Sequence, residues 1–184
     1  MTIIYSNMLD EDCRILQRIW RNIPNINLVE ITPQSENWED EVDDAISKEI
    51  EILLFLGHGT TNGLLFPNFD KNEYILHENN INLIKADMII CCWCYASIFC
   101  QTYNLIPSFS TSMFISNIDE AINNGYSNYT QSEINNINGK FYDEINYLLI
   151  NNIPLNKWIT YLRSHLDIKN GIDFFNRDGL MVNL

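Results

Sequence analysis

Two short apolar runs limit what this 184-residue chain can fold into more than any other feature. The first, residues 52–57, is followed by His58 and Gly59, and the second, residues 87–94, ends on Cys94. Each run suits a strand that is buried on both faces and is too short for a helix. In a parallel sheet both runs end at the carboxyl edge, where α/β proteins place their ligands. The pattern therefore predicts that an imidazole and a thiol lie side by side.

The rest of the chain alternates between strand and helix patterns, which indicates one α/β domain over residues 1–184 with a mainly parallel, doubly wound sheet. We expect the other strands at residues 2–6, 27–32, 112–116 and, as a last edge strand, 179–184. We expect helices at residues 10–23 (capped by Asp10), 37–48, 78–85, 96–105 and 133–151, and another opened by Pro154. Residues 62–68 suit a small hairpin over the edge of the sheet.

Charge and cysteine content exclude several classes of function. The chain has 24 acidic and 11 basic residues, so it lacks the basic surface that nucleic acids or anionic membranes require, and cationic peptides would be attracted instead. The five cysteines do not form a disulfide framework, which favours a reducing cytoplasm. The first residues do not resemble a signal peptide, and no apolar run reaches transmembrane length.

Cys94 and His58 are the residues best placed for chemistry. Cys94 lies where a strand is expected to turn into a helix, whose N-terminus would stabilise a thiolate. Gly59 lets a peptide carbonyl approach the backbone, so the N–H groups of Gly59 and Cys94 could hold an oxyanion. The alternatives are a buried structural cysteine and a histidine satisfied within a turn. His77 and His165 have no comparable context.

The cluster of Cys91, Cys92 and Cys94 does not favour a metal site. Strand alternation puts Cys92 and Cys94 on one face and Cys91 on the other, whereas a structural zinc needs four convergent ligands. We therefore expect no metal and no organic cofactor. A flavodoxin-like domain that binds a small molecule is a weaker alternative, because no strand is followed by a glycine-rich phosphate loop.

The stretch 86–94, Ala-Asp-Met-Ile-Ile-Cys-Cys-Trp-Cys, resembles the nucleophile strand of CHAT-domain cysteine peptidases, which are relatives of caspases and separases in clan CD. Residues 56–59, Leu-Gly-His-Gly, are similar to the catalytic His-Gly of that family, and residues 112–121 to its fifth strand and the acidic continuation. The resemblance runs from about residue 50 to residue 166. It implies a caspase-like three-layer sandwich with a mainly parallel central sheet, in which His58 and Cys94 form a catalytic dyad.

The chain departs from the family pattern in three ways. Trp93 stands where a small residue usually precedes the nucleophile, and Ile115 replaces an aromatic residue of the fifth strand. The repeat domains that often accompany CHAT modules are absent from this sequence. Trp93 could therefore block or reshape the site.

The distribution of charge predicts which peptides such a site would prefer. An aspartate-binding pocket needs arginines, but neither the loop after the first strand nor residues 112–130 contain a basic residue. Both contain acids, so we expect a pocket for Arg or Lys, built from Asp119, Glu120 and Asp10, with Asp119 as the first candidate. The alternative is that Asp119 caps the next turn.

These observations together predict a cysteine endopeptidase that cleaves proteins or peptides after basic residues and is regulated by a partner protein. The polar residues 116–130 would form a loop ordered only by substrate or partner. The alternative is a catalytically inactive domain of the same fold that serves as a protein-binding module.

Overall fold

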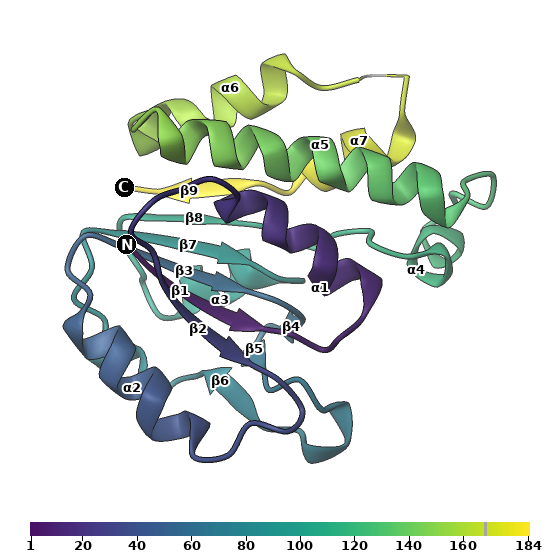
Figure 1. Cartoon of the computed structure of the whole chain (residues 1–184). Coiled ribbons are helices and arrows are strands. Elements are labelled where there is room, and N and C mark those ends of the chain that lie inside the picture. Colours follow the sequence, from purple (N-terminus) through teal and green to yellow (C-terminus); the bar gives the residue numbers. More distant parts are fainter. Residues whose placement is uncertain (168) are drawn as a thin grey trace.

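The computed structural model describes residues 1–167 and 169–184. It contains a six-stranded sheet in the order β2-β1-β3-β7-β8-β9, in which only β9 runs antiparallel to its neighbour. Its strands are β1 Thr2–Ser6, β2 Asn27–Ile31, β3 Ile52–Leu56, β7 Met88–Cys92, β8 Ser108–Ser110 and β9 Met181–Asn183. In Figure 1 the strands follow one another from β9 at the top to β2 at the bottom, with α1 on the near face of the sheet and α3 on the far face. The fold is therefore a three-layer α/β arrangement with a mainly parallel sheet, as the alternation of patterns predicted.

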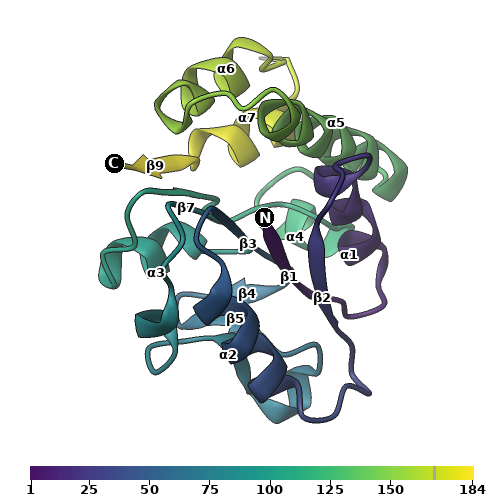
Figure 2. The same cartoon turned by 60° about the vertical axis from the view of Figure 1, so that its left-hand side comes forward.

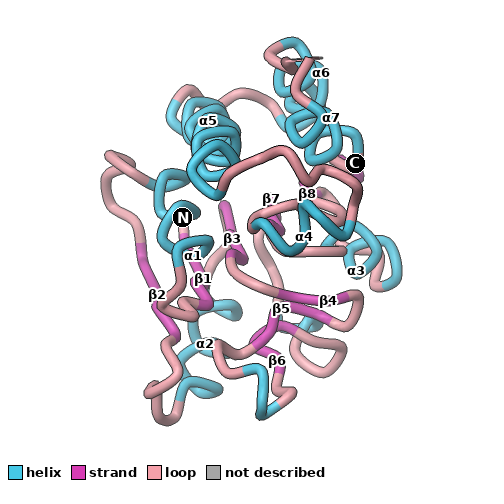
Figure 3. Tube along the Cα trace, turned by 90° about the vertical axis from the view of Figure 1, so that its right-hand side faces the viewer, coloured by secondary structure: helices cyan, strands magenta, loops and turns pink. Residues whose placement is uncertain are grey.

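The helical layers cover opposite faces of the sheet (Figure 2). One layer contains α1 (Glu11–Leu16), α5 (Gln131–Ile150), α6 (Trp158–Ser164) and α7 (Gly171–Asp178). The other contains α2 (Trp38–Lys48), α3 (Ala96–Thr102) and a small sheet of β4 (Gly59–Thr60), β5 (Gly63–Leu65) and β6 (Tyr74–Leu76). A short helix, α4 (Ile118–Asn123), lies at the carboxyl edge of the main sheet, which faces the viewer in Figure 3.

Strand alternation divides the apolar residues between two cores. Ile4, Phe55 and Cys91 contribute to the core under α2 and α3, whereas Tyr5, Leu56 and Cys92 contribute to the core under α1 and α5. Neighbouring residues of β1, β3 and β7 thus face opposite layers and are buried on both sides. This confirms that Cys91 and Cys92 lie on opposite faces of the sheet.

The fifth strand was predicted in the wrong place: it is β8, Ser108–Ser110, rather than residues 112–116. Phe109 is the one large apolar residue of β8, so the strand has little sequence signal, whereas residues 113–115 are continuously apolar. Those residues form an irregular segment instead. Side-chain amides of Asn138 and Asn176 donate to the Ile115 carbonyl, and the Asn176 carbonyl oxygen accepts from the Ile115 N–H. These amides supply the hydrogen bonds that a neighbouring strand would otherwise provide.

Several other boundaries differ from the sequence prediction. The expected helix 78–85 is only a 3₁₀ turn at Ile81–Leu83, and the expected helix 10–23 is α1 followed by a 3₁₀ turn at Gln17–Trp20. The hairpin expected within residues 62–68 is absent: this range contains a single strand, β5, which pairs with β4 and β6 on either side. Two helices, α4 and α7, were not predicted. The capping role of Asp10 and the final edge strand are confirmed, since Asp10 accepts from the Cys13 N–H and β9 pairs with β8.

None of the helices in the described part of the chain is long and apolar enough to span a membrane. The longest, α5, has 20 residues and carries charged side chains along its length.

Ion pairs fix α5 to the segment after α1, because Asp143 of α5 pairs with Arg18 and Arg21.

Candidate functional site

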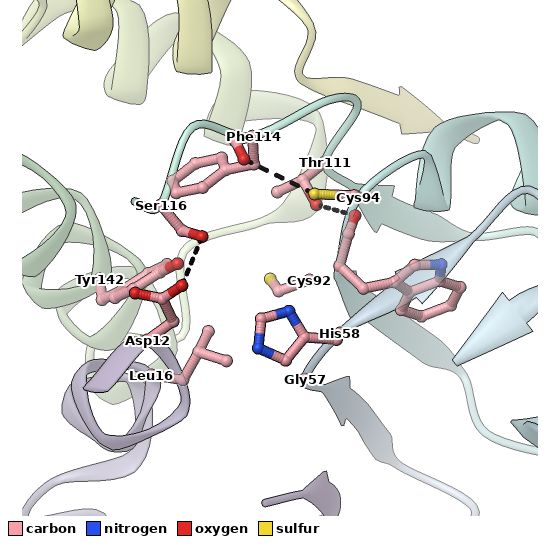
Figure 4. Close-up of a pocket in the computed structure, with 11 residues that line it drawn as sticks. Asp12, Leu16, Gly57, His58, Cys92, Cys94, Thr111, Phe114, Ser116 and Tyr142 are labelled. Carbon is pink, nitrogen blue, oxygen red and sulfur yellow. Dashed lines mark hydrogen bonds between the residues drawn. The ribbon is translucent and has the colours of Figure 1, made fainter. Parts of the chain in front are cut away.

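The sheet register brings His58 and Cys94 to the same edge. Leu56 of β3 pairs with Cys92 of β7 in parallel, and His58 and Cys94 each lie two residues beyond this pair. Both strands end before the functional residue, so each side chain is carried by the connection that leaves the sheet. Both residues line one cavity, shown in Figure 4, together with Asp12, Thr111, Phe114 and Tyr142.

The cavity is narrow, and both His58 and Cys94 are partly exposed in it. Its volume is about 30 Å³, which is room for one or two water molecules and not for an amino-acid side chain. Leu16, Phe114 and Tyr142 supply apolar walls, and Phe114 stacks against Tyr142 with ring centroids 5.8 Å apart. An amino-acid side chain would fit into this cavity only if part of the wall moved.

His58 is held by Asp10, the residue that also caps α1. Its Nε2 lies 2.8 Å from Asp10 Oδ2, while Asp10 Oδ1 accepts from the Cys13 N–H at 2.8 Å. Burial alone would lower the pKa of His58, but hydrogen bonds to Asp10 and Cys13 outweigh burial and raise it to about 10. Burial is the largest single influence on Asp10 and raises its pKa, but the hydrogen bonds to His58 and to the Cys13 N–H together outweigh burial, and the pKa falls to about 2. At neutral pH the pair is therefore an imidazolium and a carboxylate.

Cys94 is protonated at neutral pH in this conformation. Its thiol donates to the Phe114 carbonyl at 3.5 Å. Burial raises its pKa to about 11, and the nearby carboxylates of Glu120 and Asp12 act in the same direction. The sequence had led us to expect a thiolate stabilised by the following helix. However, α3 begins at Ala96 and the thiol points to Phe114 instead (Figure 4).

One of the two proposed oxyanion donors is free. Among the described residues, nothing accepts a hydrogen bond from the Cys94 N–H. The other donor, Gly59, lies under the indole of Trp93, and a Cβ at position 59 would come within 2.1 Å of that ring. Glycine at this position is therefore required by close packing with Trp93.

Trp93 does not project into the cavity as a plug. Its side chain is 3% exposed, its Nε1–H donates to the Thr60 carbonyl at 3.1 Å, and its ring packs edge-on against Phe99. The indole thus fastens the turn after β7 to the small sheet, while Cys94 faces the opposite layer.

Acidic side chains surround the cavity, although not all of those expected. Ser116 Oγ donates to Asp12 Oδ2 at 2.7 Å and also lies 3.0 Å from Glu120 Oε2. Asp12 lines the cavity, whereas Glu120 reaches it only through Ser116. Asp119 is exposed on α4 and Asp10 is occupied by His58. Burial raises the pKa of Asp12.

Sequence reasoning placed His58 and Cys94 but missed Asp12 as a cavity residue. In the sequence, Asp12 is only the last of three consecutive acids after the first strand. Helical spacing offers a signal that was not used: Asp12 and Leu16 are four residues apart on α1, and both line the cavity. Phe114 and Tyr142 come from a misassigned strand and a distant helix, so no local pattern connects them to the site.

Comparison of the chain with protein-family models, with curated proteins and with solved structures finds no match.

Proposed function

We propose that this protein is a cysteine endopeptidase with a caspase-like fold, in which Cys94 is the nucleophile and His58 the proton-transfer group. The observation that carries the proposal is their placement two residues beyond paired positions of adjacent parallel strands, in the wall of one cavity. A thiol and an imidazole in such proximity are the minimum equipment for thiol-dependent acyl transfer. The ordered resemblance of residues 50–166 to CHAT-domain peptidases supports the same reaction.

The reaction follows from these groups. The Cys94 thiol first releases its proton to solvent, since His58 is already protonated. The sulfur attacks the scissile carbonyl, and the free Cys94 N–H stabilises the developing oxyanion. The C–N bond then breaks as His58 gives a proton to the leaving amine, which leaves a thioester on Cys94 and a neutral His58. Neutral His58 takes a proton from the water that attacks the thioester, the C–S bond breaks to release the acid product, and solvent reprotonates the Cys94 thiolate. No organic cofactor or metal takes part.

The substrate we propose is a protein or peptide with Arg or Lys on the acyl side of the cut. Asp12 supplies a carboxylate in the cavity wall, and Glu120 lies behind Ser116. The arginines of the described chain bind other groups away from the cavity, so they cannot neutralise an acidic substrate side chain there. Their partners are Glu11 for Arg14, Asp143 for Arg18 and Arg21, the Asp178 carbonyl for Arg163, and Asp173 and Glu144 for Arg177.

The conformation described here corresponds to a resting state in this proposal. The Cys94 thiol is bound to Phe114 and the His58 imidazolium to Asp10, so neither group is yet available to the other. Activation requires the Cys94 thiol to leave Phe114 and the cavity wall to open. We propose that a regulatory protein causes this change in the cytoplasm, whose reducing conditions suit five free cysteines.

The high pKa of Cys94 and its bond to Phe114 also favour a second candidate, an inactive domain that binds another protein. Labelling distinguishes the two. A thiol-directed, peptide-based inhibitor that carries Arg or Lys should form a covalent adduct on Cys94, located by mass spectrometry. The adduct should be lost in Cys94→Ala and retained in Cys91→Ala and Cys92→Ala. Those two controls each remove a sulfur from β7, the strand that leads to Cys94.

Three outcomes would count against the peptidase. An adduct on Cys92 in place of Cys94 would show that the wrong cysteine was chosen. Equal labelling by a peptide-free thiol reagent would show a reactive cysteine without a substrate site. The absence of an adduct both in the pure chain and in extract would favour the binding module. Circular dichroism of each variant would exclude loss of fold as the cause.

A further inference from the structure

His58 also belongs to a second group of reactive side chains, which does not include Cys94. Asp10, Cys13 and His58 each offer one ligand atom, and these three atoms all lie within 4.8 Å of one another. Asp10 is the cap of α1, Cys13 lies in its first turn, and His58 follows β3. Carboxylate, thiol and imidazole thus converge from two elements that are far apart in sequence.

The backbone orients these groups toward one point. Asp10 uses Oδ1 to cap the Cys13 N–H, which leaves Oδ2 directed at His58 Nε2. The Cys13 thiol has only weak partners, since it donates to the Ser6 carbonyl at 3.4 Å and accepts from the Met8 N–H at 3.5 Å. Moving the Cys13 thiol away from these partners would therefore cost little free energy.

The donor set and its spacing suit a zinc ion. Zn²⁺ binds thiolate at about 2.3 Å and imidazole or carboxylate at about 2.0 Å, so tetrahedral ligand atoms are about 3.3–3.7 Å apart. His58 and Asp10 would separate slightly from 2.8 Å, and Cys13 would move closer. A mixed set of sulfur, nitrogen and oxygen donors selects zinc over calcium or magnesium, which prefer oxygen alone.

Access to this point is also open. The side chains of Asp10 and His58 are 39% and 22% exposed, while Cys13 is fully buried beneath them. A metal ion can therefore enter between the two exposed ligands and reach the thiol at the base. These residues supply three ligands, so water would complete the tetrahedral coordination of zinc.

We propose that Asp10, Cys13 and His58 form a zinc-binding site that holds the His58 imidazole away from Cys94. Binding releases the thiol proton of Cys13 and the proton between His58 and Asp10 to solvent, and the ion replaces both. The three ligands then carry a total charge that balances Zn²⁺. Because His58 is the proposed proton-transfer group, bound zinc would keep the peptidase inactive, a consequence that rests on the proposed function.

The test is metal binding by the full chain. Co²⁺ is added as a spectroscopic substitute, and the thiolate-to-cobalt absorption band in the near ultraviolet reports sulfur ligation. Zn²⁺ should remove the band, and calorimetry should give one ion bound per chain. Cys13→Ser should abolish the band. Asp10→Asn, which retains the helix cap, should weaken binding at least about tenfold, since even partners of ligands contribute that much.

Matched variants show which cysteine binds the metal. Cys94→Ala and Asp12→Asn should bind Co²⁺ as the parent chain does. Loss of the band in Cys94→Ala, with retention in Cys13→Ser, would overturn the proposal and place the ion on the dyad. Absence of the band in the parent chain would also overturn it.

The inhibitory consequence has a separate readout. Zn²⁺ should protect Cys94 from the peptide-based inhibitor in the parent chain and fail to protect it in Cys13→Ser. A cobalt band in a chain that never forms a Cys94 adduct would support the metal site while counting against the peptidase, so the two proposals can fail independently. Unchanged labelling of the zinc-loaded chain would overturn the inhibitory role.

Discussion

At the scale of single residues, the Asp10–His58 pair couples the stability of the fold to pH. The pKa of Asp10 falls to about 2, so its contribution is present above the unfolded value near 4 and is lost as pH falls toward 2. The pKa of His58 rises to about 10, so its contribution is present below about 6.5 and is lost as pH rises toward 10. The pair therefore stabilises the fold most between about pH 4 and pH 6.5.

Asp10→Asn removes the charge and retains an N-cap. We expect the variant to lose about 1–2 kcal/mol of unfolding free energy near pH 5.5, a value reduced because solvent screens a carboxylate that is 39% exposed. The loss should become small at pH 10. Urea titrations of both proteins, without metal, measure it. A loss that is the same at pH 5.5 and pH 10 would show that Asp10 acts only as a cap.

The position of a functional residue was predictable where a strand determines it, whereas its hydrogen-bond partner was not. His58 and Cys94 follow buried runs, and parallel pairing places such residues at one edge. The partners they select, Asp10 and the Phe114 carbonyl, are 48 and 20 residues away in sequence. No local pattern encodes those contacts, so the protonation state of the dyad could not be inferred.

At the scale of elements, α1 and α4 present the acids that would select a substrate. Asp12 on α1 lines the cavity, while Asp119 on α4 is exposed. Asp12→Asn should reduce the rate of Cys94 labelling by Arg or Lys inhibitors about 10–100-fold, as expected for loss of a hydrogen bond between charged groups. The isosteric Asp119→Asn should change it less than about twofold. Second-order labelling rates for Arg, Lys and Asp inhibitors measure both effects.

The opposite result is equally informative. A selective loss in Asp119→Asn would mean that α4 turns its exposed acid into the site when substrate binds. Fastest labelling by the Asp inhibitor would exclude a basic specificity altogether.

Helices and strands were predicted correctly where the apolar pattern is strong. The prediction was wrong where polar side chains form the hydrogen bonds that a neighbouring strand would form. β3 and β7 are continuous apolar runs typical of buried strands, and α5 has apolar residues at helical spacing. Residues 113–115 are as apolar as a strand, yet Asn138 and Asn176 satisfy the backbone of Ile115 from two helices. Residues 116–130, expected as a loop, contain α4 because the Asn117 side chain caps it.

At the scale of the whole molecule, the site is lined by parts of both sequence halves. α1 contributes Asp12 and Leu16, the segment after β8 contributes Phe114 and Ser116, and α5 contributes Tyr142. The segment after β8 is the wall that must move to free the nucleophile, since its Phe114 carbonyl accepts from the Cys94 thiol. With a pKa of about 11, about one Cys94 thiol in ten thousand is ionised at pH 7. A thiol in this state reacts slowly, because the thiolate is the attacking species.

A partner that displaces the Phe114 segment should therefore raise the reactivity of Cys94. Solvent would reach the thiol, its pKa would fall, and the cavity would admit a substrate side chain. We expect the rate of inhibitor labelling to rise at least about tenfold when extract from the source cells is added to the purified chain. Heat treatment of the extract should abolish the increase if the activator is a protein. The Cys94→Ala chain in the same extract controls for labelling elsewhere. A purified monomer that already reacts as fast as the chain in extract would show that the narrow cavity opens without help and that no partner is required.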